Sequence, residues 1–105
     1  IVVGWDKARM EVARNAALGF FESNGQVGEI LEAPVNGYAS FFIGPDGSKE
    51  GWADSDEGDQ RRTNFLEWLE TSRYEDRSSP FHWAEVVVGS DDGDAYVSRH
   101  TWSED

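Results

Sequence analysis

Apolar residues recur with a helical period in the first long segment of the chain, residues 6–24. Asp6 is a typical N-cap residue, and Asn24-Gly25 readily adopts the left-handed conformation that ends a helix. Charged and amide side chains occupy the opposite side of the helical wheel. The pattern predicts an amphipathic helix, and its apolar side carries Met10, Ala13, Ala17, Phe20 and Phe21.

Three runs rich in β-branched and aromatic residues follow, separated by turn sequences. The first, residues 27–35, has a proline near its end, which favours an edge strand because proline cannot donate to a strand ladder. Asn36-Gly37 is typical of a tight hairpin turn and leads into a strand over residues 38–43. Gly44-Pro45-Asp46-Gly47 predicts a type I turn that closes onto a third strand, residues 48–53.

A second helical period begins within a group of acidic residues. Asp54 as N-cap, with Glu57 three residues later, resembles a capping box, and carboxylates near a helix N-terminus are stabilised by the helix dipole. The apolar positions predict a helix that ends near residue 73 or 74. One of its faces carries Arg62, Phe65, Leu66 and Leu69.

The last part of the chain reads as a long β-hairpin, for which two registers compete. A two-residue Asp-Gly loop pairs Trp83 with Trp102, and it also pairs Glu85 with His100. A three-residue loop pairs Glu85 with Arg99 instead. We favour the first register because type I′ turns prefer Asp-Gly and because it creates a cross-strand Trp–Trp contact.

These elements predict an α+β fold, built as a two-layer sandwich with the order α-β-β-β-α-β-β. Two helices should pack on one face of a mainly antiparallel sheet of about five strands. The 105 residues fit one domain, residues 1–105, since no repeat or low-complexity linker interrupts them.

The net charge of the chain indicates which kinds of molecule it can bind. Twenty-one acidic residues against nine basic ones give a formal net charge of −12. Nucleic acid binding requires a basic patch, and the chain has no cluster of three or more Lys or Arg. We therefore expect no direct nucleic acid binding and a partner with a basic surface. Whether the charge serves binding, or only solubility or adaptation to high salt, stays open at this point.

Several other classes of site and location are disfavoured. The chain has no cysteine, which excludes disulfides, thiol nucleophiles and Cys-ligated metals. No apolar run reaches the length of a membrane span, so we expect a cytoplasmic protein with no membrane contact. The acidic run from Asp54 fits an EF-hand loop poorly, because its twelfth position is Phe65 instead of glutamate. We expect neither a metal nor a cofactor.

Three candidate sites remain. The acidic partner-binding candidates fall in two stretches of the sequence and comprise Asp46, Glu50, Asp54, Asp56, Glu57, Asp59, Asp91, Asp92 and Asp94. In the favoured register, Glu85 orients His100 as a general base, which makes these two the catalytic candidates. An aromatic patch on the last hairpin, exposed if the helices cover its other face, comprises Trp83, Tyr96 and Trp102.

Our leading hypothesis is a small, non-catalytic, acidic interaction module that binds a basic protein surface. One specific form is a nucleic acid mimic, in which carboxylates take the place of phosphates and inhibit a DNA- or RNA-binding protein. The first alternative is a small enzyme that uses His100 and Glu85 as an acid/base pair. The second is a structural or oligomeric protein, such as a homodimer, that associates through the aromatic hairpin face.

Overall fold

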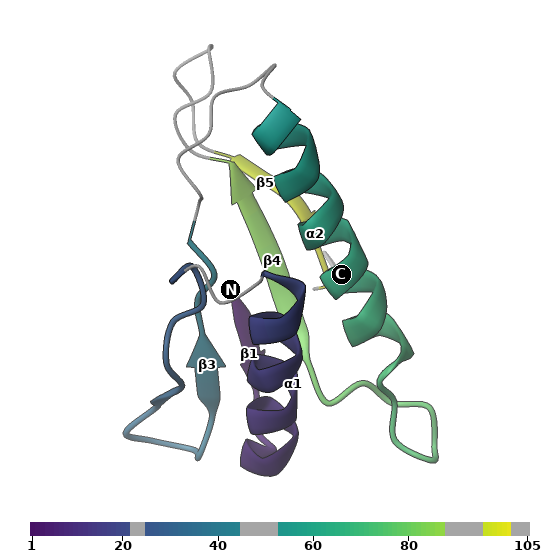
Figure 1. Cartoon of the computed structure of the whole chain (residues 1–105). Coiled ribbons are helices and arrows are strands. Elements are labelled where there is room, and N and C mark those ends of the chain that lie inside the picture. The colour runs from purple at the N-terminus through teal and green to yellow at the C-terminus, as the bar shows by residue number, and fades with distance from the viewer. Residues whose placement is uncertain (22–24, 45–52, 88–95, 102–105) are drawn as a thin grey trace.

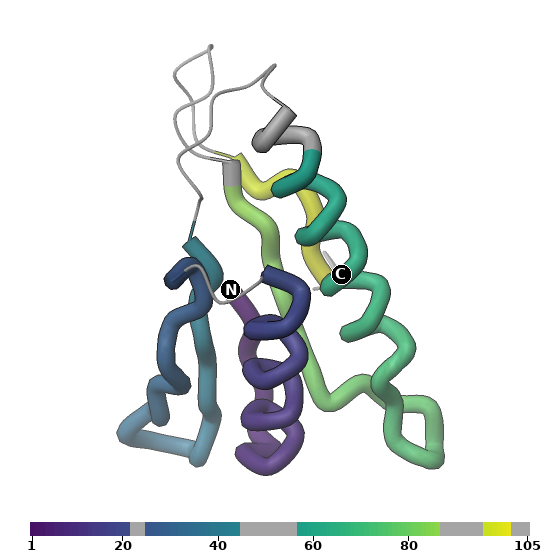
Figure 2. Tube along the Cα trace, in the orientation of Figure 1, coloured from purple at the N-terminus to yellow at the C-terminus, as the bar shows by residue number. Residues whose placement is uncertain are grey.

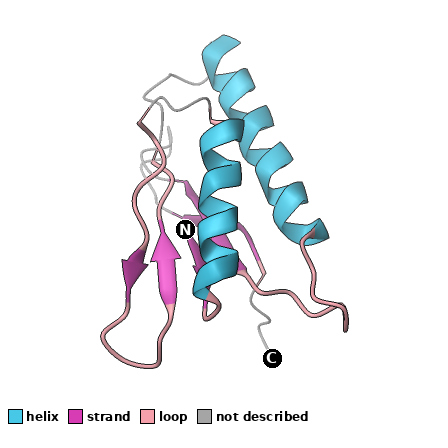
Figure 3. Cartoon of the chain, turned by 60° about the horizontal axis from the view of Figure 1, so that its bottom comes forward, coloured by secondary structure: helices cyan, strands magenta, loops and turns pink. Residues whose placement is uncertain are grey.

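The protein has two helices packed on one face of a five-stranded antiparallel sheet (Figure 1 and Figure 3). The computed structural model describes residues 1–21, 25–44, 53–87 and 96–101, and for residues 53–56 and 87 it describes the backbone alone. Along the chain the elements are β1 (Val2–Gly4), α1 (Lys7–Phe20), β2 (Leu31–Glu32), β3 (Ala39–Phe41), α2 (Ala53–Thr71), β4 (His82–Val87) and β5 (Tyr96–His100). The predicted α+β class is confirmed.

The element order differs from the predicted one at its start. β1 precedes α1 and occupies the centre of the sheet, whose strand order is β2-β3-β1-β4-β5. Val2 of β1 pairs with Phe41 on one side and with Trp83 on the other. A strand of three residues is too short to show alternation, so the apolar pattern did not reveal it. Of the strand expected at residues 48–53, residues 48–52 lie outside the described residues, and Ala53 already belongs to α2.

α1 begins where the sequence predicts. The backbone N–H of Arg9 donates to Asp6 Oδ1 at 3.2 Å, which confirms Asp6 as the N-cap. The helix ends at Phe20, four residues before the predicted end. Its C-cap is Phe21, so the predicted Asn24-Gly25 stop does not end this helix, although Gly25 itself has a left-handed φ of +86°.

The β2–β3 hairpin turns at Asn36-Gly37, as predicted. The two residues have φ values of 69° and 68°, in the left-handed region that Asn and Gly tolerate, but the strand register makes the loop four residues long, 34–37, instead of two. The N–H of Ala33 donates to the carbonyl of Tyr38 at 2.8 Å, closing the loop. β2 lies at the edge of the sheet, as the proline predicted, and is only two residues long.

The core lies between the helices and the sheet and is dominated by aromatic rings. Phe65 of α2 lies at its centre, 1 % exposed, with four ring centroids between 5.8 and 6.4 Å away. These rings come from both helices and from β3, so the Phe65 side chain joins the two layers. The four rings belong to Phe20, Phe21, Phe41 and Trp68.

The favoured register of the last hairpin is wrong. Glu85 pairs with Arg99, as in the second register, but a β-bulge follows and Val86 pairs with Val97. The bulge inserts Ser98 as an extra residue in β5. The loop length alone does not predict such a bulge. We attribute it to the side-chain contacts described below.

α2 also starts earlier than predicted. Because the helix begins at Ala53, Asp54 lies in its first turn instead of at the N-cap. Glu57, the expected second half of a capping box, forms an ion pair with Arg61 at 3.6 Å. The helix ends at Thr71, and Phe65 and Leu69 on its predicted apolar face are buried.

Candidate functional site

One end of the molecule gathers the elements that flank both acidic stretches. The N-terminus of α2, the end of β4 and the start of β5 lie together at this end (Figure 1 and Figure 2). We call it the acidic end. Glu57 and Asp59, in the first two turns of α2, are exposed there. Of the other candidates, Asp54 and Asp56 are described by backbone alone within α2. Outside the described residues lie Asp46, Glu50, Asp91, Asp92 and Asp94.

The excess negative charge is distributed unevenly along the chain. The described side chains include eleven acidic and eight basic ones, which leaves them close to balance. The other ten acidic residues are accompanied by a single base, Lys49. Most of these ten fall in the stretches 46–56 and 91–94. These two stretches hold seven acids and Lys49, so half of the net charge of −12 comes from segments that join the described fold at its acidic end.

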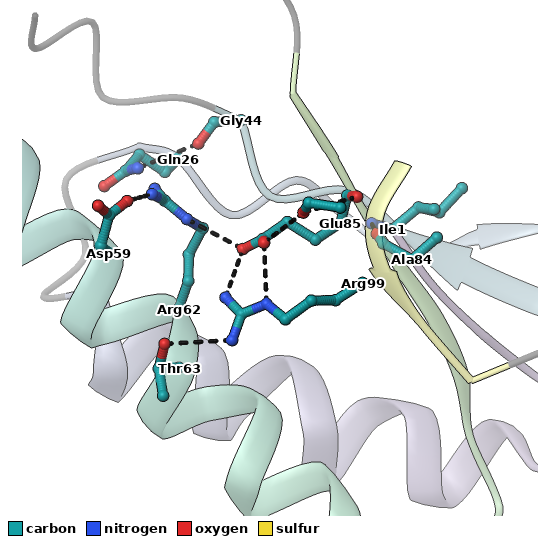
Figure 4. A network of polar contacts seen from close by, with 10 residues as sticks. Ile1, Gln26, Gly44, Asp59, Arg62, Thr63, Ala84, Glu85 and Arg99 are labelled. Carbon is teal, nitrogen blue, oxygen red and sulfur yellow. Dashed lines mark hydrogen bonds and ion pairs between the residues drawn. The ribbon is translucent and has the colours of Figure 1, made fainter. Parts of the chain in front are cut away.

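A polar network lies beneath α2 close to this end, centred on Glu85 (Figure 4). Arg99 binds the Glu85 carboxylate at two points, through Nε at 2.9 Å and Nη2 at 2.8 Å. Arg62 of α2 approaches the same carboxylate, with Nε 3.3 Å from Oε2. A carboxylate held by two guanidinium groups is a strong, directional arrangement, so it fixes the last hairpin against α2.

The β-bulge places a further hydrogen-bond donor beside the same carboxylate. Ser98 Oγ donates to Glu85 Oε1 at 2.6 Å, and Arg99 Nη1 donates to Thr63 Oγ1 on α2 at 3.3 Å. In a regular strand Ser98 and Arg99 would point to opposite faces. The bulge brings both onto Glu85. These hydrogen bonds, above all those from Arg99, hold the pKa of the Glu85 carboxyl below its usual range.

The network also reaches the exposed acids of the acidic end. Arg62 forms an ion pair with Asp59 while it contacts Glu85. The Asp59 side chain remains 66 % exposed. Arg62 therefore orients an exposed carboxylate and anchors it to the sheet, so that the acidic end has a defined geometry at this position.

The proposed acid/base pair of Glu85 and His100 does not form. His100 pairs with Ala84, the residue before Glu85, and successive strand residues point to opposite faces. His100 therefore faces away from the helices, whereas Glu85 faces α2. The Glu85 carboxylate is occupied by Arg99, Arg62 and Ser98, and its lowered pKa opposes proton uptake.

The aromatic candidates on the last hairpin lie in different environments. Trp83 is 8 % exposed and belongs to the core beneath the helices. Its indole N–H donates to Glu70 Oε1 of α2 at 3.3 Å. Tyr96 is exposed, and Trp102 lies outside the described residues. An exposed patch on this hairpin therefore excludes Trp83.

Sequence reasoning missed the part that Arg62 and Arg99 play. One signal was present, since Arg62 lies on the apolar face of the second helix, where an arginine needs a partner. Among the described residues no group of three or more His, Asp or Glu side chains is arranged to hold a metal ion. No helix in the described ranges is both long and apolar enough to cross a membrane.

Comparison with known proteins identifies no relative of this chain. No protein family model, no curated protein and no solved structure matches the chain. The functional argument therefore depends on the chain's own residues and their arrangement.

Proposed function

We propose that the protein is a small, non-catalytic interaction module that binds a basic surface of another protein through its acidic end. The single observation that carries this proposal is the distribution of charge. The described fold is nearly balanced, while both acid-rich stretches join it at the end where Glu57 and Asp59 are exposed. Charge that served only solubility would need no such concentration.

The packing beneath the acidic end supports the same function. Arg62 and Arg99 hold Glu85 between α2 and the last hairpin. The helix in which the first acid-rich stretch ends and the strands that flank the second are therefore fixed to each other. A carboxylate held in place, as Asp59 is by Arg62, loses less conformational entropy on binding than a freely rotating one. Complementary charge also accelerates association and selects basic partners over acidic ones.

A nucleic acid mimic is the specific form that we favour. Carboxylates grouped at one end of a compact acidic protein present negative charge to a protein that normally binds phosphates. The partner would then be a DNA- or RNA-binding protein, and this chain its inhibitor. We place this activity in the cytoplasm, in keeping with a chain that has no cysteine.

The experiment compares two variants with the same change in total charge. In the first, D46N/E50Q/D56N neutralises three acids of the acidic stretch. In the control, E11Q/E67Q/E75Q neutralises three exposed acids elsewhere in the described fold. The probe is a fluorescent peptide of about ten arginines, and its affinity is measured by anisotropy at about 25 and 300 mM salt.

We expect the wild type and the control variant to bind the peptide with similar affinity at low salt, and the first variant to bind about tenfold more weakly. Binding should weaken at high salt because exposed charges are then screened. Equal losses in the two variants would show that total charge, and not the acidic end, governs binding. Affinity that does not change with salt would also overturn the proposal.

A further inference from the structure

The face of the sheet that points away from the helices, here called the open face, carries many large apolar side chains. In an antiparallel sheet with one face in water, outward residues are normally polar. Here Ser40, His82 and His100 are polar outward residues, but several other outward positions, which alternate with the buried core residues, carry large apolar side chains. Six of these lie between 42 and 68 % exposed, namely Ile1, Leu31, Tyr38, Phe42, Val86 and Val97.

Strand register shows that the outward positions of neighbouring strands lie side by side, with Ser40, His82 and His100 between the apolar ones. The first row crosses four strands, because Ser40 pairs with Leu31 and with Val3, and Val3 pairs with His82. In the next row, Ile1 and Ala84 exchange backbone hydrogen bonds at 2.9 and 3.0 Å, and Ala84 pairs with His100.

The rest of the face continues these rows. Phe42 follows β3 and alternates onto the open face, since Phe41 beside it is buried in the core. The Val86–Val97 pair extends the face toward the acidic end. The open face thus runs over all five strands of the described sheet.

The strand side chains of the open face also carry little charge, in contrast to the rest of the molecule, and the charged group within its rows is the Ile1 ammonium, which donates to the Ala84 carbonyl. None of the described strand residues that alternate onto it is Asp, Glu, Lys or Arg. Glu32 and Glu85, the acidic residues of the described strands, point to the helix side, where they pair with Lys7 of α1 and Arg62 of α2. Among the described residues, the only carboxylate beside the open face is that of Glu32, at the rim of the hollow described below, so the face is suited to an uncharged, apolar partner.

From this we infer that the open face binds a second copy of this chain. A two-fold axis would place two largely apolar faces together, sheet on sheet, at the usual separation of about 10 Å. The acids of both copies would stay at the periphery. This interface is separate from the acidic end and goes beyond the binding of a basic partner.

The shape of the face supports a pairing with itself. It contains a hollow of about 230 Å³ above β1, β2 and β3, lined by Val3, Leu31, Tyr38 and Ser40 among others. Phe42 projects beside it, 60 % exposed. In a two-fold interface each contact occurs twice, so each Phe42 side chain can enter the hollow of the other copy.

The area agrees with a reversible dimer. Six half-exposed large side chains present about 450–600 Å² of apolar surface if each offers roughly 150–200 Å² in full, the lower part of the range for aromatic rings, because four of the six are aliphatic. A standard interface buries roughly 800 Å² on each partner. The open face therefore supplies most of what a dimer requires, and its size equals the largest apolar patches found on monomeric proteins.

Sedimentation velocity over a range of concentrations tests the inference. We expect a monomer–dimer equilibrium that shifts toward dimer between about 50 and 500 mM salt, because salt screens the repulsion between two chains of net charge −12. Binding of a basic peptide has the opposite salt dependence, so the two proposals can fail separately. A wild type that stays monomeric at about 1 mM and at high salt overturns the dimer.

Two double variants locate the interface. L31S/F42S removes two apolar side chains from the open face and should weaken dimerisation at least about tenfold. V12S/V35S removes two exposed valines that lie outside the strands and should change it less than about twofold. A larger loss of dimerisation in V12S/V35S than in L31S/F42S would contradict the inference.

Crosslinking locates the interface independently, and it can be used even if the L31S/F42S variant fails to fold. The chain has no cysteine, so a single one can be introduced at Ser40 on the open face or at Asn64, exposed on α2. With a short bismaleimide, S40C should form crosslinked dimers and N64C should not. Equal crosslinking of both, or crosslinking of N64C alone, overturns the assignment of the open face.

Discussion

Glu85 and Arg99 face each other across the last hairpin as a two-point ion pair, with N–O distances of 2.9 and 2.8 Å. Arg62 of α2 contacts the same carboxylate, and Thr63 of α2 accepts a hydrogen bond from Arg99. The pair therefore links the edge of the sheet to the helix whose N-terminus carries the exposed acids. Through it, the fold of the hairpin and the position of the acidic end depend on each other.

Replacement of Arg99 should weaken this link measurably. In Arg99→Ala, Glu85 keeps Arg62 and Ser98 but loses its two-point partner. We expect a loss of about 1 kcal/mol in the free energy of unfolding, because hydrogen bonds to charged groups contribute somewhat more than this and the Arg99 side chain is 40 % exposed. Urea denaturation provides the measurement.

The matched control for Arg99 is Arg73→Ala. Arg73 forms an exposed pair with Glu70 within one stretch of chain, at 2.7 Å, and such pairs contribute about 0.5 kcal/mol or less. Equal losses in the two variants would contradict a linking role for Glu85 and Arg99.

Acid should remove the contribution of Glu85. Its pKa in the folded protein lies below the usual value of 4.5, mainly because Arg99 donates to the carboxylate. A carboxyl with a lowered folded pKa stabilises the fold above its unfolded pKa, and this contribution is lost as the pH falls through the folded pKa.

The variant Glu85→Gln isolates that contribution. We expect wild type to exceed the variant in unfolding free energy at pH 7 and the difference to shrink as the pH is lowered from about 5 to 3. Denaturation at a series of pH values measures it, with E67Q on the exposed side of α2 as the control. A difference that grows on acidification would show that the sign of the linkage is wrong.

Asp6 and Tyr74 should be coupled. Tyr74 donates its O–H to Asp6 Oδ2 at 2.6 Å, while Asp6 Oδ1 caps α1 through the Arg9 N–H at 3.2 Å. The hydrogen bond from Tyr74 is the main reason that the pKa of Asp6 is lowered. Tyr74→Phe should lower the free energy of unfolding, and Asp6→Ala should lower it more, because it also removes the helix cap.

A double-mutant cycle measures the coupling between these two residues. If the hydrogen bond contributes as described, the double variant D6A/Y74F should lose less stability than the two single variants together. Strict additivity of the two losses would mean that the tyrosine and the carboxylate do not support each other.

Two glycines should respond to alanine in opposite directions. A Cβ at Gly4 would lie 2.6 Å from the Pro80 carbonyl oxygen and 2.9 Å from Met10 Sδ. Since the proline contact is with backbone, Gly4→Ala should destabilise the protein by about 1–3 kcal/mol. Gly19, in α1, has nothing within 4 Å of an added Cβ, so Gly19→Ala should stabilise it by about 0.5–1 kcal/mol. Thermal unfolding of both variants tests the packing of β1, and a neutral Gly4→Ala would contradict it.

Local signals in the sequence were sufficient for the helices and for the position of one hairpin turn. The Asp6 cap, the apolar face around Phe65 and the Asn36-Gly37 turn depend on residues close to one another in the chain. Their physical causes are therefore visible in short windows of sequence. The α+β class followed from these elements.

What depends on distant contacts could not be predicted in the same way. β1 is a strand because Val2 packs between Phe41 and Trp83, which come from segments far away in the chain. The register of the last hairpin is decided by Arg62, Ser98 and Arg99 gathering on Glu85, and a loop rule cannot anticipate such a bulge. The error in register also produced the wrong pairing of Glu85 with His100.

The acidic residues were recognised as a group from the sequence, but the sequence did not show that the elements flanking both acidic stretches meet at one end of the molecule. That inference required the fold, which places the N-terminus of α2 beside the end of β4 and the start of β5 (Figure 1). The open face was likewise hidden, because its residues come from five strands whose register is set by tertiary packing.

The central claim is that a basic partner binds at the acidic end. The most direct measurement is an NMR titration of the isotope-labelled protein with the ten-arginine peptide, followed through backbone amide shifts. We predict that the largest shifts occur in the first two turns of α2, around Glu57 and Asp59, and that they disappear at high salt. Shifts concentrated instead around Glu67 and Glu75, or spread evenly over all exposed acids, would contradict the claim.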